Sequence, residues 1–164
     1  MMRSSVRTRQ AAPKHMIKII PNFLDEETFS KFVSSFDRSK TEPVEYSPKV
    51  LTIKYNRIPL RQVMQYGKVS FIETLFYTSG AFSPSHVDNG PLDGQNNWKS
   101  TGILYCTDDY DGGEIFFSKL NINMKPKKNT FIMFPAGIGT DIYEHGVHPV
   151  ISGERIATVF RFVE

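Results

Sequence analysis

One short segment of the chain, His86-Val87-Asp88, places an imidazole and a carboxylate two residues apart. In an extended strand, side chains two residues apart lie on the same face, so His86 and Asp88 would converge. Together they make two-thirds of a 2-His-1-carboxylate facial triad, which leaves coordination positions open and suits non-haem Fe(II). A second histidine is needed to complete such a site.

Three other histidines are available as the third ligand: His15, His145 and His148. His15 belongs to an N-terminal stretch without hydrophobic periodicity. His145 and His148 precede the last strand-like segment, and because they are three residues apart they would face opposite ways in an extended chain. At most one of these two is therefore expected to join His86 and Asp88, and the other is expected at the surface or in a loop.

Arg155 begins the last strand-like segment, ten residues after His145. An arginine at the start of a strand is ordinarily a solvated charge. Beside a metal it has a second interpretation, because its planar guanidinium can hold a carboxylate through two parallel hydrogen bonds. A dicarboxylate that chelates a metal at one end would need such a group at its other end.

The segments that would position these residues read mainly as strands. They are rich in β-branched and aromatic residues and are separated by Gly, Pro, Asn and Asp clusters. The predicted strands are 17–20, 69–77, 100–106, 114–117, 130–134 and 155–163.

Two helices are predicted before most of these strands. Asp25 is a candidate N-cap, and the apolar residues that follow it keep a helical spacing, from Phe29 to Phe36. A second, shorter helix is predicted between Pro59 and Gly67. Helices followed by many short strands predict a mostly β fold with N-terminal helices, built as a sandwich or jelly roll.

Composition limits the class of protein. The 164 residues fit one domain, predicted at 17–164, and the single cysteine, Cys106, excludes an intrachain disulfide and a cysteine-rich zinc site. Cys106 follows Tyr105 and is expected to face away from any pocket that Tyr105 lines. No apolar run approaches the roughly 18–20 residues of a membrane span. With one cysteine and no signal peptide, an intracellular location is expected.

The net charge of +3 is unevenly distributed. Residues 1–20 hold five basic and no acidic residues, which leaves 15 basic and 17 acidic residues in the rest of the chain. The basic stretch 1–16 is predicted to be a disordered leader, with a partner-binding arm or a transit peptide as alternatives. The slightly acidic remainder disfavours nucleic-acid binding.

Several short motifs, taken in chain order, resemble those of 2-oxoglutarate- and Fe(II)-dependent dioxygenases of the prolyl 4-hydroxylase type. The resemblance covers about residues 17–164, and Tyr77 stands nine residues before the metal motif, as in the collagen-type and algal enzymes. The matching segments are Ile19-x-Pro21-x-Phe23-Leu24-Asp25, His86-Val87-Asp88-Asn89, Leu104-Tyr105 with Asp111-Gly112-Gly113-Glu114, Lys125-Pro126-Lys127 through Phe134-Pro135, and His145-Gly146-Val147-x-Pro149-Val150-x-x-Gly153-x-Arg155.

This resemblance implies a double-stranded β-helix (jelly-roll) core and a set of site residues. It implies His86, Asp88 and His145 as iron ligands, His145 being preferred because of its spacing to the following proline and to Arg155. Arg155 would then pair with the distal carboxylate of 2-oxoglutarate. The resemblance also implies two hydroxyl donors to this cosubstrate, Tyr77 and Tyr105, for which core tyrosines are the alternative.

Two further positions are candidate substrate contacts. Arg161 lies six residues after Arg155, on the same face of a regular strand. The hypoxia-factor enzymes place a large aromatic residue near this position, whereas the R-x5-R spacing is similar to that of AlkB nucleic-acid demethylases. A solvated or ion-paired strand end is the alternative for Arg161. Asn89 opens the polar segment 89–97, which by resemblance closes over a peptide substrate and otherwise is a hairpin connection.

The function implied by the resemblance is hydroxylation of an amino-acid side chain, foremost proline, in a peptide or protein. The reaction would be coupled to decarboxylation of 2-oxoglutarate to succinate, with Fe(II), O2 and ascorbate as a reductant. The alternatives are an AlkB-like nucleic-acid demethylase and a non-catalytic jelly-roll binding module. The sequence does not specify an oligomeric state.

Overall fold

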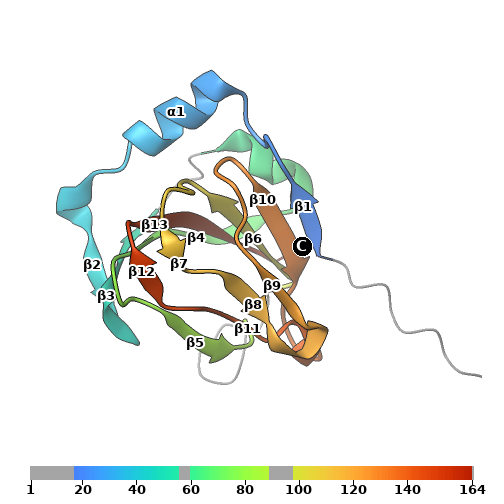
Figure 1. Cartoon of the computed structure of the whole chain (residues 1–164). Helices are drawn as coiled ribbons and strands as arrows, with labels where there is room; N and C mark the ends of the chain where they lie inside the picture. The colour runs from blue at the N-terminus through green and yellow to red at the C-terminus, as the bar shows by residue number, and fades with distance from the viewer. Residues whose placement is uncertain (1–16, 56–59, 89–97, 164) are drawn as a thin grey trace, which may run out of the picture.

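The computed structural model describes residues 17–55, 60–88 and 98–163. The predicted leader 1–16, Pro59, and the segment 89–97 with Asn89 lie outside the described residues. Within the described part, strands form most of the regular structure, and one α-helix and four 3₁₀ helices connect them (Figure 1).

The first part of the chain contains most of the helical structure. Its elements are β1 (Lys18–Ile20), α1 (Glu26–Ser34), the 3₁₀ helix η1 (Arg38–Lys40), β2 (Glu42–Val44), β3 (Ser47–Lys54), the 3₁₀ helix η2 (Arg61–Tyr66), β4 (Val69–Tyr77) and β5 (Ser83–His86). The rest is mainly strands. Its strands are β6 (Ser100–Tyr105), β7 (Asp111–Gly112), β8 (Ile115–Phe117), β9 (Ile122–Met124), β10 (Phe131–Pro135), β11 (His145–Val147), β12 (Val150–Ser152) and β13 (Arg155–Phe162). Two 3₁₀ helices, η3 (Ser118–Leu120) and η4 (Asp141–Tyr143), lie between them.

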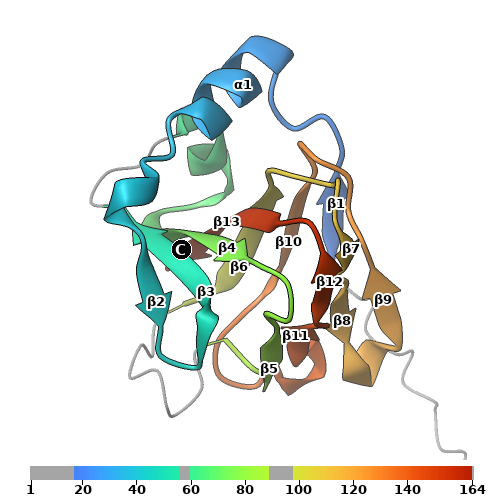
Figure 2. The ribbon, with the colours of Figure 1, turned by 60° about the vertical axis from the view of Figure 1, so that its left-hand side comes forward.

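Two antiparallel sheets dominate the described residues. The larger has seven strands in the order β1-β10-β6-β13-β4-β3-β2, and the smaller has four in the order β5-β11-β8-β9. A short pair, β12 with β7, lies beside them. Figure 2 shows α1 on one side of the large sheet and the four-stranded sheet on the other. This arrangement confirms the predicted mostly β fold with N-terminal helices and a jelly-roll core.

Alternating side chains give the large sheet two apolar faces, because successive residues of a strand point to opposite sides. On β13, Ala157 and Val159 join the core cluster between the sheets, together with Phe117 of β8. Phe160, one residue after Val159, joins a second cluster with Phe32 of α1. The helices therefore cover the outer face, and the inner face is left for the space between the sheets.

The start of α1 forms as its sequence predicts. The carboxylate of Asp25 accepts hydrogen bonds from the backbone nitrogen of Thr28, at 2.8 Å, and from the Thr28 hydroxyl, at 2.7 Å. These bonds satisfy donors that an isolated helix leaves unpaired. The second predicted helix is a 3₁₀ helix, η2, which ends before Gly67 as expected.

Several strands of the structure were not predicted from the sequence, and most of these are very short. β5, β7, β9, β11 and β12 have two to four residues each and were not predicted, nor were β2 and β3. The longer β4 and β13 match their predictions within a residue. The segments of two to four residues are too short for a period-2 pattern and become strands through pairing with distant neighbours. β3 has eight residues, but it begins Ser47-Pro48, and a proline weakens a strand pattern. No helix within the described ranges is long and apolar enough to span a bilayer.

The thiol of Cys106 provides a test of the packing beneath α1. Cys106 is buried in the same cluster as Phe32, on the other side of the sheet from Tyr105, as predicted. Burial raises the pKa of its thiol to about 12. Because the thiolate is the reactive form, the native protein should react very slowly with a disulfide reagent at pH 8. Unfolding in denaturant should give rapid reaction of one thiol per chain. Rapid labelling of the native protein would contradict the packing described for this face.

Candidate metal and cosubstrate site

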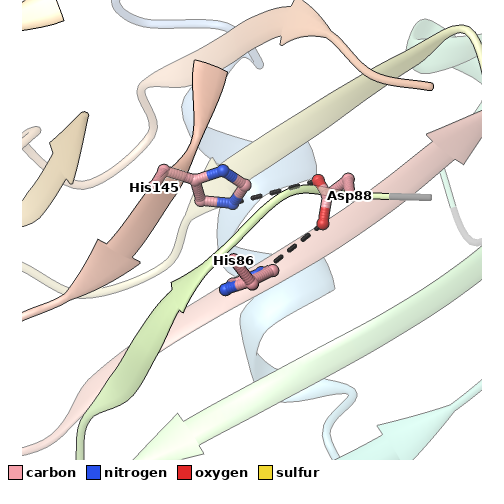
Figure 3. Close-up of side chains that lie close together, drawn as sticks. All are labelled: His86, Asp88 and His145. Carbon is pink, nitrogen blue, oxygen red and sulfur yellow. Dashed lines mark ion pairs between the residues drawn. The ribbon is translucent and has the colours of Figure 1, made fainter. Parts of the chain in front are cut away.

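Pairing of β5 with β11 brings two histidines together from distant parts of the sequence. His86 and His145 are direct partners in the register of these antiparallel strands, so their side chains lie on the same face. Their ring centroids are 4.5 Å apart. Asp88 follows β5 in a turn and points to the same place (Figure 3). The predicted convergence of His86 and Asp88 occurs, although the strand ends at His86.

Each histidine is oriented by a backbone carbonyl. The Nδ1 of His86 is 2.8 Å from the carbonyl oxygen of Pro84, and the Nδ1 of His145 is 2.9 Å from that of Tyr143. A carbonyl can only accept, so each Nδ1 donates and each Nε2 is available to a metal. The ligand atoms of His86, Asp88 and His145 all lie within 4.8 Å of one another.

The two oxygens of the Asp88 carboxylate have different surroundings. Oδ2 accepts hydrogen bonds from the Thr101 hydroxyl, at 2.5 Å, and from Nη1 of Arg161. Oδ1 is buried and has no hydrogen-bond partner among the described residues. It lies 3.5 Å from Nε2 of His86. A buried acceptor without a partner is costly, and a metal ion held with the two Nε2 atoms would satisfy it.

The charges of this cluster favour a cation. Burial works against the charged carboxylate, but Arg161 and His145 hold the pKa of Asp88 well below its usual range. Burial lowers the pKa of His145 to about 4, which keeps its imidazole neutral. For His86, burial opposes protonation, but the hydrogen bond and charge of Asp88 raise its pKa. A divalent metal can take the place of that proton.

His148, the other candidate for the third ligand, lies elsewhere. It follows β11, is exposed, and its ring contacts that of Phe116, with centroids 4.5 Å apart. The ring of His145 instead packs between Phe117 and Phe134, with centroid distances of 5.4 and 4.8 Å. The structure therefore places one of the two, His145, beside His86 and Asp88, in agreement with the expectation from their spacing.

One cavity of about 740 Å³ connects this cluster with Arg155. Arg155 begins β13 and is 2% exposed. No carboxylate among the described residues forms an ion pair with it, and its Nε has no hydrogen-bond partner there. Because arginine is not deprotonated in proteins, an unpaired buried guanidinium calls for an anionic ligand. A small dicarboxylate in the cavity would meet that requirement, so the residues fit 2-oxoglutarate.

Tyrosines surround the guanidinium of Arg155. Its Nη2 donates to the hydroxyl of Tyr105 at 3.2 Å, and its Cζ lies 4.8 Å from the ring centroid of Tyr77. Tyr77 lines the cavity, and its hydroxyl is 3.3 Å from that of Tyr46. Tyr105 is fully buried and is not among the cavity-lining residues. The structure thus gathers both predicted tyrosines at Arg155, and their bonding to a cosubstrate stays a prediction.

Another tyrosine, Tyr110, lies near this group without a motif that predicts it. The Tyr110 hydroxyl is buried without a hydrogen-bond partner among the described residues, and burial raises its pKa to about 12. Arg155 is among the charges that act on it. Tyr110 lies in an acidic, Gly-rich connection whose sequence signals only a turn, so its position could not be read from local pattern.

The lining of the cavity also contains aromatic and acidic side chains from other parts of the chain. Tyr46, Phe71 and Trp98 contribute aromatic rings, and Glu45 and Glu73 contribute carboxylates. None of these residues stands in a motif that marks it as a candidate for the site. Tyr46 follows β2 and Phe71 lies on β4, so their approach depends on how the sheet forms.

Arg161, a predicted substrate contact, lies in the same cavity but is ion-paired with Asp88. Its side chain is 11% exposed, and its Cζ lies 4.9 Å from the ring centroid of Trp98. This contact corresponds to the ion-paired alternative for Arg161, although the pair lies inside the cavity rather than at a solvated strand end. The role of Asn89 stays a prediction, since Asn89 is outside the described residues.

The geometry predicts that His145 and His148 differ in metal binding. His145→Ala should weaken binding of Mn(II) by more than about 100-fold, because losing a ligand exceeds the roughly 10- to 100-fold cost of losing an outer partner. His148→Ala should leave the affinity unchanged. Isothermal titration of the purified variants measures both. Equal losses in the two variants, or no loss in His145→Ala, would contradict the assignment.

Comparison with solved structures supports the architecture. A viral collagen prolyl hydroxylase from Paramecium Bursaria Chlorella virus-1, solved with 2-oxoglutarate, matches with a TM-score of 0.69 and 17% identity, covering 93% of this chain and 98% of that chain. A Pseudomonas putida prolyl-4-hydroxylase matches with a TM-score of 0.69 and 16% identity, covering 92% and 94%. At these identities the likeness establishes the fold that the chain shares with them.

Sequence comparison adds a curated relative and a family. Prolyl 3-hydroxylase 2 of Mus musculus is 35% identical over an alignment of 95 residues, and the match covers 48% of this chain and 13% of the relative. The chain thus aligns with a small part of that protein's length. A sequence model of the 2OG-Fe(II) oxygenase superfamily matches residues 72–162, which is more than half of the chain and includes every candidate metal and cosubstrate residue named above. The chain belongs to the 2OG-Fe(II) oxygenase superfamily.

Proposed function

We propose that this protein is an Fe(II)- and 2-oxoglutarate-dependent oxygenase that hydroxylates a prolyl residue in a peptide or protein. One observation carries the proposal. A single cavity contains the His86, Asp88 and His145 cluster and a buried arginine, Arg155, without a carboxylate partner among the described residues. This combination provides for a metal and for a dicarboxylate in the same space, as the superfamily requires.

The proposal gives a task to each of the six predicted metal and cosubstrate residues. His86, Asp88 and His145 hold Fe(II), through the two Nε2 atoms and the free Oδ1 of Asp88. Arg155 pairs with the distal carboxylate of 2-oxoglutarate, and Tyr77 and Tyr105 act as hydroxyl donors around it. The aromatic body of each tyrosine packs in the core, and its polar end faces the charged group.

When bound, Fe(II) and 2-oxoglutarate supply the oxidation: one oxygen atom of O2 enters succinate, the other enters a substrate C–H bond, and CO2 leaves. The protein orients the participants and keeps water from them. The three protein ligands would leave positions on the metal open for the cosubstrate and O2. No side chain is required as a nucleophile. Ascorbate is proposed as the reductant that keeps the iron in its Fe(II) state.

The choice of a prolyl substrate has two supports. The names of the similar proteins describe prolyl hydroxylases, including a collagen prolyl hydroxylase and a prolyl 3-hydroxylase. The wall of the cavity also carries Tyr46, Phe71 and Trp98, whose flat apolar rings suit contact with a pyrrolidine ring. Asn89 is proposed as a further substrate contact.

The proposed activity predicts two linked products. Purified protein with Fe(II), ascorbate, 2-oxoglutarate and a proline-rich peptide library should form succinate and add 16 Da to a peptide. Mass spectrometry detects the mass increase, and amino-acid analysis after hydrolysis distinguishes 3-hydroxyproline from 4-hydroxyproline. Asp88→Ala should abolish both products, because the metal loses its anionic ligand.

Other outcomes would redirect or overturn this proposal. Full activity of Asp88→Ala would refute the metal assignment. Failure of the wild-type protein to bind Mn(II) and 2-oxoglutarate would favour a non-catalytic module. Oxidation of a methylated oligonucleotide in place of peptides would favour the nucleic-acid alternative.

Arg155 is predicted to determine the affinity for 2-oxoglutarate. Arg155→Gln should weaken binding of 2-oxoglutarate by about 10- to 100-fold, since a hydrogen bond to a charged group contributes roughly 1.5–3 kcal/mol. Arg155→Lys should lose less, because it keeps the charge but not the planar pair of donors. Titration of the Mn(II)-loaded protein measures the affinity. An unchanged affinity in Arg155→Gln would refute the role, provided that Mn(II) still binds.

A further inference from the structure

The carboxylate of Asp88 is held by a closed set of three side chains. Nη1 of Arg161 donates to Oδ2 of Asp88 and, at 2.7 Å, to the hydroxyl oxygen of Thr101. The Thr101 hydroxyl in turn donates to the same Oδ2 at 2.5 Å. We propose that Arg161 and Thr101 are positioning residues, which hold Asp88 so that its Oδ1 alone faces the metal.

Strand register brings the two positioning residues together. Arg161 on β13 and Thr101 on β6 are direct partners across the large sheet, so both side chains leave the sheet on its inner face. On its other side, β13 pairs Arg161 with Phe71 of β4. The guanidinium is held over the ring of Trp98, with Cζ 4.9 Å from the centroid. These contacts leave Arg161 little freedom to turn away from Asp88.

The charge of Arg161 matches the burial of Asp88. Asp88 is 2% exposed, and an isolated carboxylate at such a depth would be strongly unfavourable. Among the described residues, the basic groups within 4.0 Å of its carboxylate are His86, His145 and Arg161. The two histidines must be neutral to bind a metal, so Arg161 is the member of this set that stays charged at a loaded site.

The arrangement determines how Asp88 can bind a metal. Oδ2 already accepts two hydrogen bonds, whereas Oδ1 accepts none from the described residues. Oδ2 also lies 3.9 Å from Nε2 of His145, but its two hydrogen bonds occupy it, so a carboxylate held in this way offers Oδ1 to the metal. The second position that a bidentate carboxylate would occupy thus stays open for cosubstrate or O2.

The two arginines of β13 therefore have different tasks. Arg155 and Arg161 are six residues apart on one face, a separation of about 20 Å along an extended strand. Arg155 has no carboxylate partner among the described residues, which leaves it free for a ligand. Arg161 is already paired with a carboxylate of the protein. A single strand thus supplies one cation for the cosubstrate and another for the metal ligand.

The test compares Mn(II) affinity, without 2-oxoglutarate or peptide, in variants of these residues. Arg161→Gln should weaken Mn(II) binding by about 10- to 100-fold, the cost typical of losing an outer partner of a metal ligand. Arg161→Lys, which keeps the charge, should recover part of this loss. Thr101→Val, which keeps the shape but removes the hydroxyl, should weaken binding in the same direction. The matched control is Arg38→Gln, because Arg38 forms an arginine–carboxylate pair with Glu154 away from the cavity; it should leave Mn(II) binding unchanged.

A spectroscopic measurement separates positioning from a general loss of structure. With Co(II) in the site, a carboxylate free to bind through both oxygens changes the coordination number, so the visible spectrum should change in Arg161→Gln and Thr101→Val. The spectrum of Arg38→Gln should match that of the wild-type protein. If Arg161→Gln fails to fold, Arg161→Lys and Thr101→Val provide the same readouts.

The inference rests on the proposed metal site and is independent of the proposed substrate. Wild-type protein that fails to bind Mn(II) would overturn the proposed function. Wild-type binding with an unchanged affinity and Co(II) spectrum in Arg161→Gln and Thr101→Val would overturn only the positioning role. A variant Arg161→Gln with normal Mn(II) binding and a raised KM for peptide would instead assign Arg161 to substrate contact.

Discussion

Buried charge is the constraint on which the space between the two sheets depends. Asp88, Arg155 and Arg161 lie in a cavity that is lined mainly by aromatic and aliphatic side chains, together with the carboxylates of Glu45 and Glu73. A buried charge is tolerated when it is paired and hydrogen-bonded. Arg161 and Asp88 meet this condition within the protein, whereas Arg155 is left for a ligand. Binding of a dicarboxylate would give Arg155 the carboxylate partner that the described residues do not supply.

The scaffold makes this arrangement rigid. Both arginines stand on β13, a central strand paired on both sides, by β4 and by β6. The outer face of the same sheet is packed beneath α1 and η2, so β13 cannot shift without disturbing that core. The two histidines come from the four-stranded sheet. Since both arginines and both histidines are anchored in sheets, the distances among them are set by sheet packing. Asp88 lies in the turn after β5 and is held by its hydrogen bonds to Thr101 and Arg161.

Local sequence patterns predicted most of the longer elements, although not the eight-residue β3. Asp25 and the apolar residues after it predicted α1, and the long apolar runs predicted β4 and β13 within a residue. The patterns did not predict β5 and β11, which have four and three residues. These are the strands that pair His86 with His145. The segments most important for the site were therefore the least readable, because they become strands only when they pair with each other.

The sequence by itself determined the residue types that a metal and a dicarboxylate need. His86, Asp88, His145 and Arg155 could be named from spacing and resemblance, because the chemistry restricts them to a few residue types. Tertiary structure decided between partners: His148 is turned to the surface, Arg161 meets Asp88, and Tyr110 lies buried near Arg155. The physical reason is that burial and pairing of charge depend on residues far apart in the chain, which only the packed sheets bring within hydrogen-bonding distance.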